Sequence, residues 1–194
     1  MNRWLSIILW LIGAVVGLGL LERFVLFPVL MPNAPHTHGL ILRHLSSQPL
    51  PVRGSTIAFT DPLNPHARFL RNLCLGECLA LPGDTLRLFM PPVSSPQSPS
   101  QWVSLRVPQK GDTVRVTADN QYLLANALQM FEGVNVCLCN DGQLSIDGRE
   151  GNSIVVTRDY IWLRSRSPHT AYDSRTFGLL PAQNVVGKLW LSFR

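Results

Sequence analysis

The chain has 194 residues, which allows one domain or one domain with an anchor and leaves enough length to bury a core. Its formal net charge of +5 comes almost wholly from scattered arginines, because lysine occurs only at Lys110 and Lys188. No basic run interleaved with aromatic residues is present, which argues against a nucleic-acid partner. With 15 prolines and 14 glycines between short β-type runs, the composition favours a mainly β fold over a helical one.

The first predicted element is an uncharged apolar run from Trp4 to Leu21. As a helix rising about 1.5 Å per residue it would be about 27 Å long, close to the hydrocarbon thickness of a bilayer. Arg3 favours a cytoplasmic N-terminus, although Arg23 weakens the bias. A cleavable signal peptide is the alternative, but the run is longer than its usual core and apolar residues resume from Phe24 to Met31. We expect an uncleaved single-span anchor and juxtamembrane segment in residues 1–30.

Two histidines, His36 and His38, follow in the segment Met31-Pro-Asn-Ala-Pro-His-Thr-His-Gly-Leu40. Alternate residues of a strand share a face, so the two side chains invite a metal interpretation. Two ligands with no third carboxylate or histidine nearby make a poor site. We therefore expect exposed loop histidines and no metal.

The next elements are predicted strands. One spans Val52 to Pro62, and another contains Cys74 and Cys78. Pro82-Gly83-Asp84 then predicts a tight turn, because proline presets its backbone angle, glycine takes a positive φ, and the aspartate hydrogen-bonds back onto the turn. Pro91 to Ser100 is rich in proline and serine and is predicted to be a flexible exposed loop.

The four cysteines form two sequence pairs, Cys74 with Cys78 and Cys137 with Cys139. A zinc site is conceivable from their number, but these spacings do not fit the commoner zinc pairs. Outside the cytoplasm disulfides are permitted but not required. We expect structural cysteines, free or paired, and no cofactor.

The second half of the chain contains one more predicted helix, from Tyr122 to Phe131. Lys110 lies in a polar turn sequence, Pro-Gln-Lys-Gly-Asp, and Lys188 belongs to the predicted final strand. Neither position readily supplies a buried amine.

Several motifs in order resemble the type I signal peptidase family, membrane-anchored serine proteases with a Ser/Lys dyad. Cys78-Leu-Ala-Leu-Pro-Gly-Asp84 resembles one box of that family, and Asp173-Ser-Arg175 with Gly178 and Val186-Gly-Lys188 resembles another. The strand from Val52 resembles a third box, with Ser55 in place of an aspartate. Residues 103–155 are similar to an insertion that members from the Bacteroidetes group carry.

The resemblance implies a mainly β, signal-peptidase-like extracytoplasmic domain in residues 31–194, behind a single N-terminal transmembrane helix. The proline- and serine-rich loop at 91–100 and the insertion at about 103–155 belong to this domain. It implies a single-pass protein of the inner (cytoplasmic) membrane with its C-terminal domain in the periplasm. The substrate-groove and scaffold positions that it implies are Leu79, Leu81, Pro82, Gly83, Asp84, Asp173, Ser174 and Arg175.

The catalytic positions of the family are replaced in this chain. Pro35 falls at the nucleophile, Gly76 at the base and Ala171 at the serine that orients the base. Proline has no hydroxyl to attack with, and glycine has no amine to accept the proton. Thr37 is the nearest hydroxyl and comes two places late. Removing a nucleophile or base alone costs roughly a millionfold in a serine protease, so we expect no useful rate.

The sequence therefore predicts a non-catalytic signal peptidase homologue of the secretion pathway. Its implied partners are the membrane, preprotein signal peptides, an active paralogue or secretion machinery. One alternative is a divergent active signal peptidase, and Ser167, His169 and Asp173 supply triad residue types. They lie in one short loop, whereas catalytic triads converge from separate elements. Another alternative is a structural partner in an envelope complex that binds no peptide.

Overall fold

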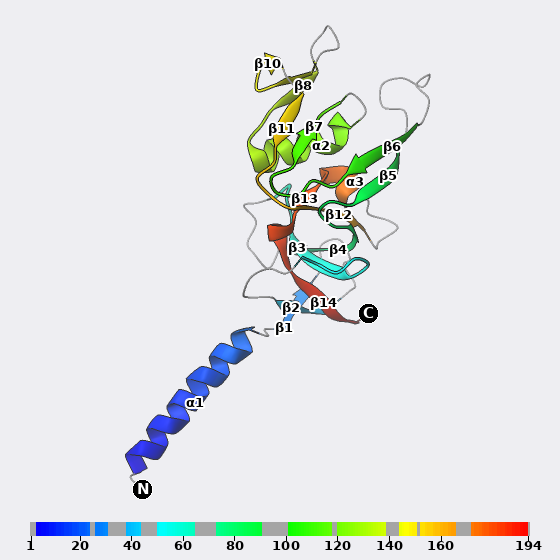
Figure 1. Cartoon of the computed structure of the whole chain (residues 1–194). Helices are drawn as coiled ribbons and strands as arrows, with labels where there is room; N and C mark the ends of the chain where they lie inside the picture. Colours follow the sequence, from blue (N-terminus) through cyan, green and yellow to red (C-terminus); the bar gives the residue numbers. More distant parts are fainter. Residues whose placement is uncertain are drawn as a thin grey trace.

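A seven-stranded antiparallel sheet forms the centre of the computed structural model (Figure 1). The structure describes residues 3–23, 26–30, 38–43, 50–64, 73–90, 101–117, 120–138, 144–150, 152–165 and 172–193. The strands of the central sheet are, in spatial order, β1 (Leu26–Leu30), β2 (His38–Arg43), β14 (Val185–Phe193), β3 (Thr56–Thr60), β4 (Leu73–Ala80), β12 (Tyr160–Arg164) and β13 (Leu180–Pro181). The predicted mainly β fold is confirmed.

Three smaller sheets accompany the central one. The first pairs β5 (Thr85–Met90) with β6 (Gln101–Arg106), and the second pairs β7 (Thr113–Arg115) with β11 (Ser153–Val155). The third contains β8 (Val136–Leu138), β9 (Leu144–Ile146) and β10 (Arg149–Glu150). Asp147 and Gly148, both with positive φ, connect β9 to β10 and form a two-residue hairpin turn.

The helix predicted at residues 122–131 is present. It consists of α2 (Gln121–Ala127) followed directly by a π-helical turn, η2 (Leu128–Glu132). Gly133 takes a left-handed conformation with φ of 70° and ends it. Two shorter elements have no counterpart in the sequence prediction, the four-residue helix α3 (Ser174–Phe177) and the 3-10 turn η3 (Ala182–Asn184).

The N-terminal helix α1 (Arg3–Arg23) covers the predicted apolar run and extends away from the β body (Figure 1). Its described side chains are Trp4 and those of residues 6–17, and the large apolar ones among them are exposed. Over the part of the chain that the structure describes, we find no helix with the length and apolar character that a membrane crossing needs.

Two large groups of buried side chains lie on opposite faces of β12, which directs Tyr160 and Trp162 to one side and Ile161 and Leu163 to the other. The α2 core consists of Ala80, Val103, Leu105, Val107, Val116, Leu123, Leu124, Ala127, Leu128, Val156, Tyr160, Trp162 and Leu179. The β4 core consists of Ile57, Phe59, Cys74, Cys78, Ile161, Leu163, Phe177 and Leu180. Residues from the expected insertion thus share the α2 core with strands β4 and β12.

Candidate functional site

The turn predicted after β4 is formed as expected. Gly83 has φ of 87°, the N–H of Asp84 donates to the carbonyl of Leu81 at 3.0 Å, and the N–H of Leu81 donates to Asp84 Oδ2 at 2.8 Å. Arg53 pairs with the same carboxylate at 2.5 Å. The hydrogen bond from the Leu81 N–H has the largest effect and lowers the pKa of Asp84 below its usual value. Burial raises this pKa by a smaller amount, and Arg53 lowers it further. The carboxylate therefore stabilises the turn.

The turn is also fastened to the start of the next segment. The N–H of Gly83 donates to the carbonyl of Val107 at 2.8 Å, and the N–H of Val107 donates to the carbonyl of Asp84 at 2.7 Å. Pro82 occupies the turn beside Gly83. These contacts close the base of the β5–β6 hairpin against β4.

Leu79 and Leu81, the implied groove residues, are both partly buried but pack in different places. Leu79 contacts the α2 core and Leu81 contacts the β4 core. Strand β4 ends at Ala80, so the alternation that would place both side chains on one face stops between them. The structure does not bring the two leucines together as walls of one groove.

The base position, Gly76, lies buried in the middle of β4. A Cβ atom added there would be 3.3 Å from Phe59 Cε1 and 3.4 Å from Leu163 Cβ. Phe59 and Leu163 are fully buried members of the β4 core. The position therefore has no amine, and a Cβ added there would require Phe59 or Leu163 to shift by a few tenths of an ångström.

Neither lysine supplies the missing amine. Lys188 on β14 is in register with Ile57, whose partner on β4 is Gly76. Two strand spacings separate Lys188 from Gly76, which is about 10 Å, and the lysine side chain is exposed. Lys110 is exposed in a turn, where its N–H donates to Asp159 Oδ1 at 2.9 Å just before β12. A lysine acts as a general base only where burial keeps it neutral, so these two positions do not suit that role.

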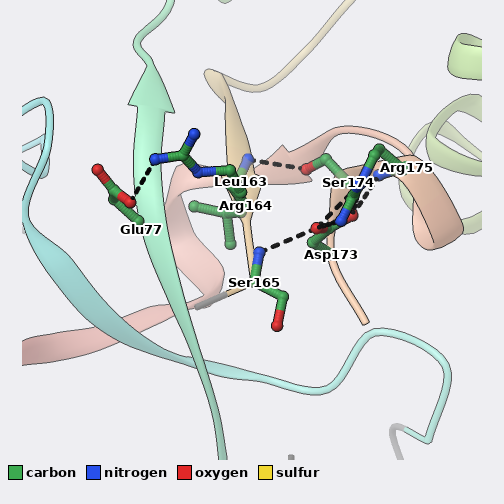
Figure 2. A network of polar contacts seen from close by, with 7 residues as sticks. All are labelled: Glu77, Leu163, Arg164, Ser165, Asp173, Ser174 and Arg175. Carbon is green, nitrogen blue, oxygen red and sulfur yellow. Dashed lines mark hydrogen bonds and ion pairs between the residues drawn. The ribbon is translucent and has the colours of Figure 1, made fainter. Parts of the chain in front are cut away.

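The Asp-Ser-Arg box begins with a buried carboxylate. Asp173 is 1% exposed and caps the N-terminus of α3, where its Oδ1 accepts the N–H of Arg175 at 2.9 Å. Its Oδ2 accepts the N–H of Ser165 at 2.9 Å and the Arg175 guanidinium at 2.7 Å (Figure 2). Burial alone would raise the pKa of Asp173, but the hydrogen bonds from Arg175 and Ser165 outweigh it and hold the pKa below its usual value.

The other members of the box tie α3 to the central sheet. Pairing between β12 and β4 shifts register between Trp162 and Leu163, and the N–H of Leu163 donates to Ser174 Oγ at 2.9 Å. Arg164 pairs with Glu77 across β12 and β4 at 2.9 Å (Figure 2). The box is thus a polar lock that joins α3 to β12 and the residue after it, and the Arg164–Glu77 pair separately joins β12 to β4.

The hydrogen bonds of Asp173 argue against the alternative catalytic triad of Ser167, His169 and Asp173. Both carboxylate oxygens of Asp173 already accept hydrogen bonds within the scaffold, which leaves the group poorly suited to orient a catalytic histidine. Ser167 and His169 lie outside the described residues. The same is true of Pro35, His36, Thr37 and Ala171, so the structure does not place the nucleophile loop or the orienting position.

Cys74, Cys78 and Cys137 are free thiols in the structure. Cys74 and Cys78 lie four residues apart on β4, or about 13 Å in a strand, which is beyond the reach of a disulfide. Burial raises the pKa of Cys74 to about 12 and that of Cys78 to about 11, so both thiols stay protonated at neutral pH. Cys137 is exposed, and Cys139 lies outside the described residues. Within the described part no three potential metal ligands gather.

Three polar contacts were missed by sequence reasoning. Glu132 in η2 accepts the hydroxyl of Tyr160 at 2.7 Å and that of Thr157 at 2.8 Å. The hydroxyl of Tyr172 donates to Asp61. Each contact joins residues far apart in the chain, and no local pattern in the sequence indicates them.

A scan against models of known protein families and a search of curated proteins both find no match to this chain.

Proposed function

We propose that this chain is a non-catalytic relative of the type I signal peptidases that acts in protein secretion by binding polypeptides. The observation that carries the proposal is the closed core at Gly76, where Phe59 and Leu163 fill the space next to the base position. The Pro-Gly-Asp turn and the Asp-Ser-Arg lock on either side are fully hydrogen-bonded. The turn and the lock are therefore formed while the base position at Gly76 has no catalytic group, which favours a binding protein over a protease.

The reacting groups support the same proposal. The resemblance puts a proline at the nucleophile and a glycine at the base, and both lysines in the chain are exposed and away from Gly76. A serine protease that loses its nucleophile or base keeps only the effects of binding and oxyanion stabilisation, about a millionfold below its normal rate. Loss of both groups therefore leaves a binding protein.

The same proposal includes a single-span anchor, which rests on the apolar sequence of residues 4–21, since among the described residues no helix meets the length and apolar character of a membrane crossing. Helix α1 has 21 residues and, at 1.5 Å per residue, is about 31 Å long. The sequence between Arg3 and Glu22 carries no charge, and large apolar side chains such as Trp4, Ile8 and Val15 are exposed along the described part. A helix that is apolar on every side belongs in a core or in a membrane, and Figure 1 shows no core around it. We place the β body on the periplasmic face of the inner membrane.

Anchoring is tested by washing membranes that contain the protein with alkaline carbonate. The full chain is expected to stay in the membrane fraction, and a chain lacking residues 1–23 is expected to be released. Release of the full chain would contradict the anchor.

Catalysis is tested by incubating the purified full-length chain, in detergent, with a secretory preprotein beside an active signal peptidase. We expect cleavage by the active enzyme and none by this chain. Turnover at an ordinary rate by this chain would refute the proposal.

Peptide binding is tested with a photo-crosslinking residue at Leu81, next to the Pro-Gly-Asp turn. The matched control is the same residue at Val155 on β11, which is exposed on another sheet. The preprotein is expected to crosslink to position 81 and not to position 155. Equal labelling at both positions, or none, would leave the structural-partner alternative as the better description.

A further inference from the structure

The β5–β6 hairpin has an inner face that is packed and an outer face that is unusually apolar. Alternate residues along both strands point to opposite faces. The inner residues Leu86, Leu88, Val103 and Leu105 belong to the α2 core or pack against it. An outer face exposed to water normally carries polar residues, yet it presents Phe89 at 55% exposure and Trp102 at 62%.

These aromatic residues form part of an ordered surface. Phe89 and Trp102 are direct cross-strand partners with ring centroids 5.4 Å apart, and the Arg87 guanidinium lies 5.7 Å from the centre of the Trp102 ring. We define the hairpin outer face as Thr85, Arg87, Phe89, Trp102, Ser104 and Arg106. Tryptophan and arginine are the residue types that contribute most to protein interfaces.

The charge of this surface is positive. Neither β5 nor β6 contains a carboxylate. Among the described residues, Arg106 has one acidic neighbour, Asp112 at 3.5 Å, and Arg87 has no carboxylate partner. The hairpin outer face therefore suits a partner that carries negative charge beside an apolar group.

Three kinds of partner fit less well. A second copy of this chain, with a net charge of +5, would bring like charges together. The hairpin lies at the end of the body away from α1, so a membrane that holds α1 does not meet it (Figure 1). Two guanidinium groups, one of them shared with Asp112, are too few to follow a nucleic-acid backbone.

We propose that the hairpin outer face binds an extended acidic segment of another polypeptide. Arg87 is opposite Ser104, so Arg106 is its diagonal neighbour, roughly 7–8 Å away. Acidic side chains two residues apart in an extended peptide are separated by about 7 Å, which matches this spacing. An apolar side chain two residues further along then packs on Phe89 and Trp102.

Only the exclusion of a membrane partner rests on the proposed function, through its anchor, and the vesicle measurement below tests that step separately. The rest does not, because the charged segment of a signal peptide is basic. The probe is the fluorescein-labelled peptide Gly-Ser-Glu-Thr-Glu-Thr-Phe-Ser-Gly. Its control has lysine in place of both glutamates. Binding to the full-length chain in detergent micelles is followed by fluorescence anisotropy.

The central variants are Arg87→Glu and a matched control, Arg115→Glu, which makes the same charge change at an exposed position of β7. We expect Arg87→Glu to weaken binding of the acidic peptide by about tenfold or more and Arg115→Glu to weaken it less than about twofold. The lysine peptide is expected to bind the wild-type chain at least about tenfold more weakly and to regain affinity for Arg87→Glu. Trp102→Ala is expected to weaken binding strongly, and Trp102→Phe to retain most of it.

Several outcomes would overturn the proposal. Equal losses in Arg87→Glu and Arg115→Glu would show attraction by net charge alone. Absence of binding by a wild-type chain with a native circular dichroism spectrum would also refute it. Tighter binding, through the same residues, to phosphatidylglycerol vesicles or to single-stranded oligothymidine would assign the surface to a membrane or a nucleic acid instead.

Discussion

At the scale of single residues, Gly76 and Asp173 differ in what their surroundings provide: Asp173 has hydrogen-bond donors around it, and Gly76 has packed apolar side chains. Asp173 retains every contact that a buried carboxylate needs, with three groups donating to its oxygens. Gly76 has no side chain, and the neighbouring Phe59 and Leu163 lie close to the place where a Cβ would be. A change at the first position removes interactions, whereas a change at the second adds atoms to a packed core.

Adding a side chain at position 76 is expected to destabilise the protein. Gly76→Ala forces Phe59 or Leu163 to shift by tenths of an ångström and is expected to cost about 1–3 kcal/mol. Gly76→Lys also buries a charge and is expected to cost several kcal/mol more, or to prevent folding. Urea unfolding followed by circular dichroism measures both variants. Wild-type stability of Gly76→Lys, or cleavage of a preprotein by Pro35→Ser with Gly76→Lys, would contradict this account.

The Asp173 lock is expected to weaken in acid. Because the pKa of Asp173 is lower in the folded chain than in the unfolded one, its stabilising contribution is complete above the unfolded value near 4 and is lost as the pH falls through the folded value. Asp173→Asn is expected to lower the free energy of unfolding by about 1–3 kcal/mol at pH 7, with a smaller difference in acid. Unfolding measured from pH 7 to pH 2 tests this. A difference from wild type that does not change with pH would contradict it.

At the scale of elements, α3 is a helix that is held by its neighbours. It has only four residues, too few to be stable alone, and its cap, Asp173, and its second contact, Ser174, both attach it to β12. Gly178, directly after it, has φ of 83°, and a Cβ there would be 3.0 Å from the carbonyl oxygen of Leu123 in α2. The closeness of α2 and α3 therefore requires glycine at this position.

Two alanine substitutions test whether position 178 requires glycine more strictly than an ordinary left-handed position. Gly178→Ala and Gly133→Ala both place alanine at a positive φ, but position 133 has no atom within 4 Å of the added Cβ. Gly133 (φ 70°, ψ 25°) lies in the left-handed region, where alanine costs about 1 kcal/mol, whereas Gly178 (φ 83°, ψ −153°) lies in a region that glycine alone adopts readily. Gly178→Ala is therefore expected to cost about 1–3 kcal/mol more than Gly133→Ala, from this strain and from the contact with Leu123. Thermal unfolding of the two variants measures the difference. Equal losses would show that position 178 has no stricter requirement.

At the scale of the whole molecule, the α2 core unites segments that the sequence separates. Val103, Leu105 and Leu124 come from the range predicted as an insertion, and they pack with Tyr160 and Trp162 of the central sheet. A shared core of this kind predicts one cooperative unfolding unit. Residues 103–155 should therefore not unfold before the central sheet does.

Leu124→Ala tests this cooperativity, with Leu63→Ala as the control because Leu124 is buried and Leu63 is exposed. Leu124→Ala is expected to cost about 2–5 kcal/mol and Leu63→Ala less than about 0.5 kcal/mol. Amide hydrogen exchange is expected to accelerate in β3 and β4 as well as in α2. Faster exchange confined to α2 and its neighbours in sequence would contradict a single unit.

The sequence by itself determined the mainly β fold, the turn at Pro82-Gly83-Asp84 and a helix, predicted at residues 122–131. These features depend on local chemistry, since the periodicity of apolar residues and the backbone freedom of glycine act within a few positions.

Only the tertiary structure decided the closure of Gly76 by Phe59 and Leu163, the helix α3 and the separation of Leu79 from Leu81. The apolar hairpin outer face with Phe89 and Trp102 belongs to the same group, because strand register determines which side chains meet. The physical reason is common to all of them. Each depends on atoms contributed by segments distant in the chain, and local propensity carries no information about which distant side chain fills a given space.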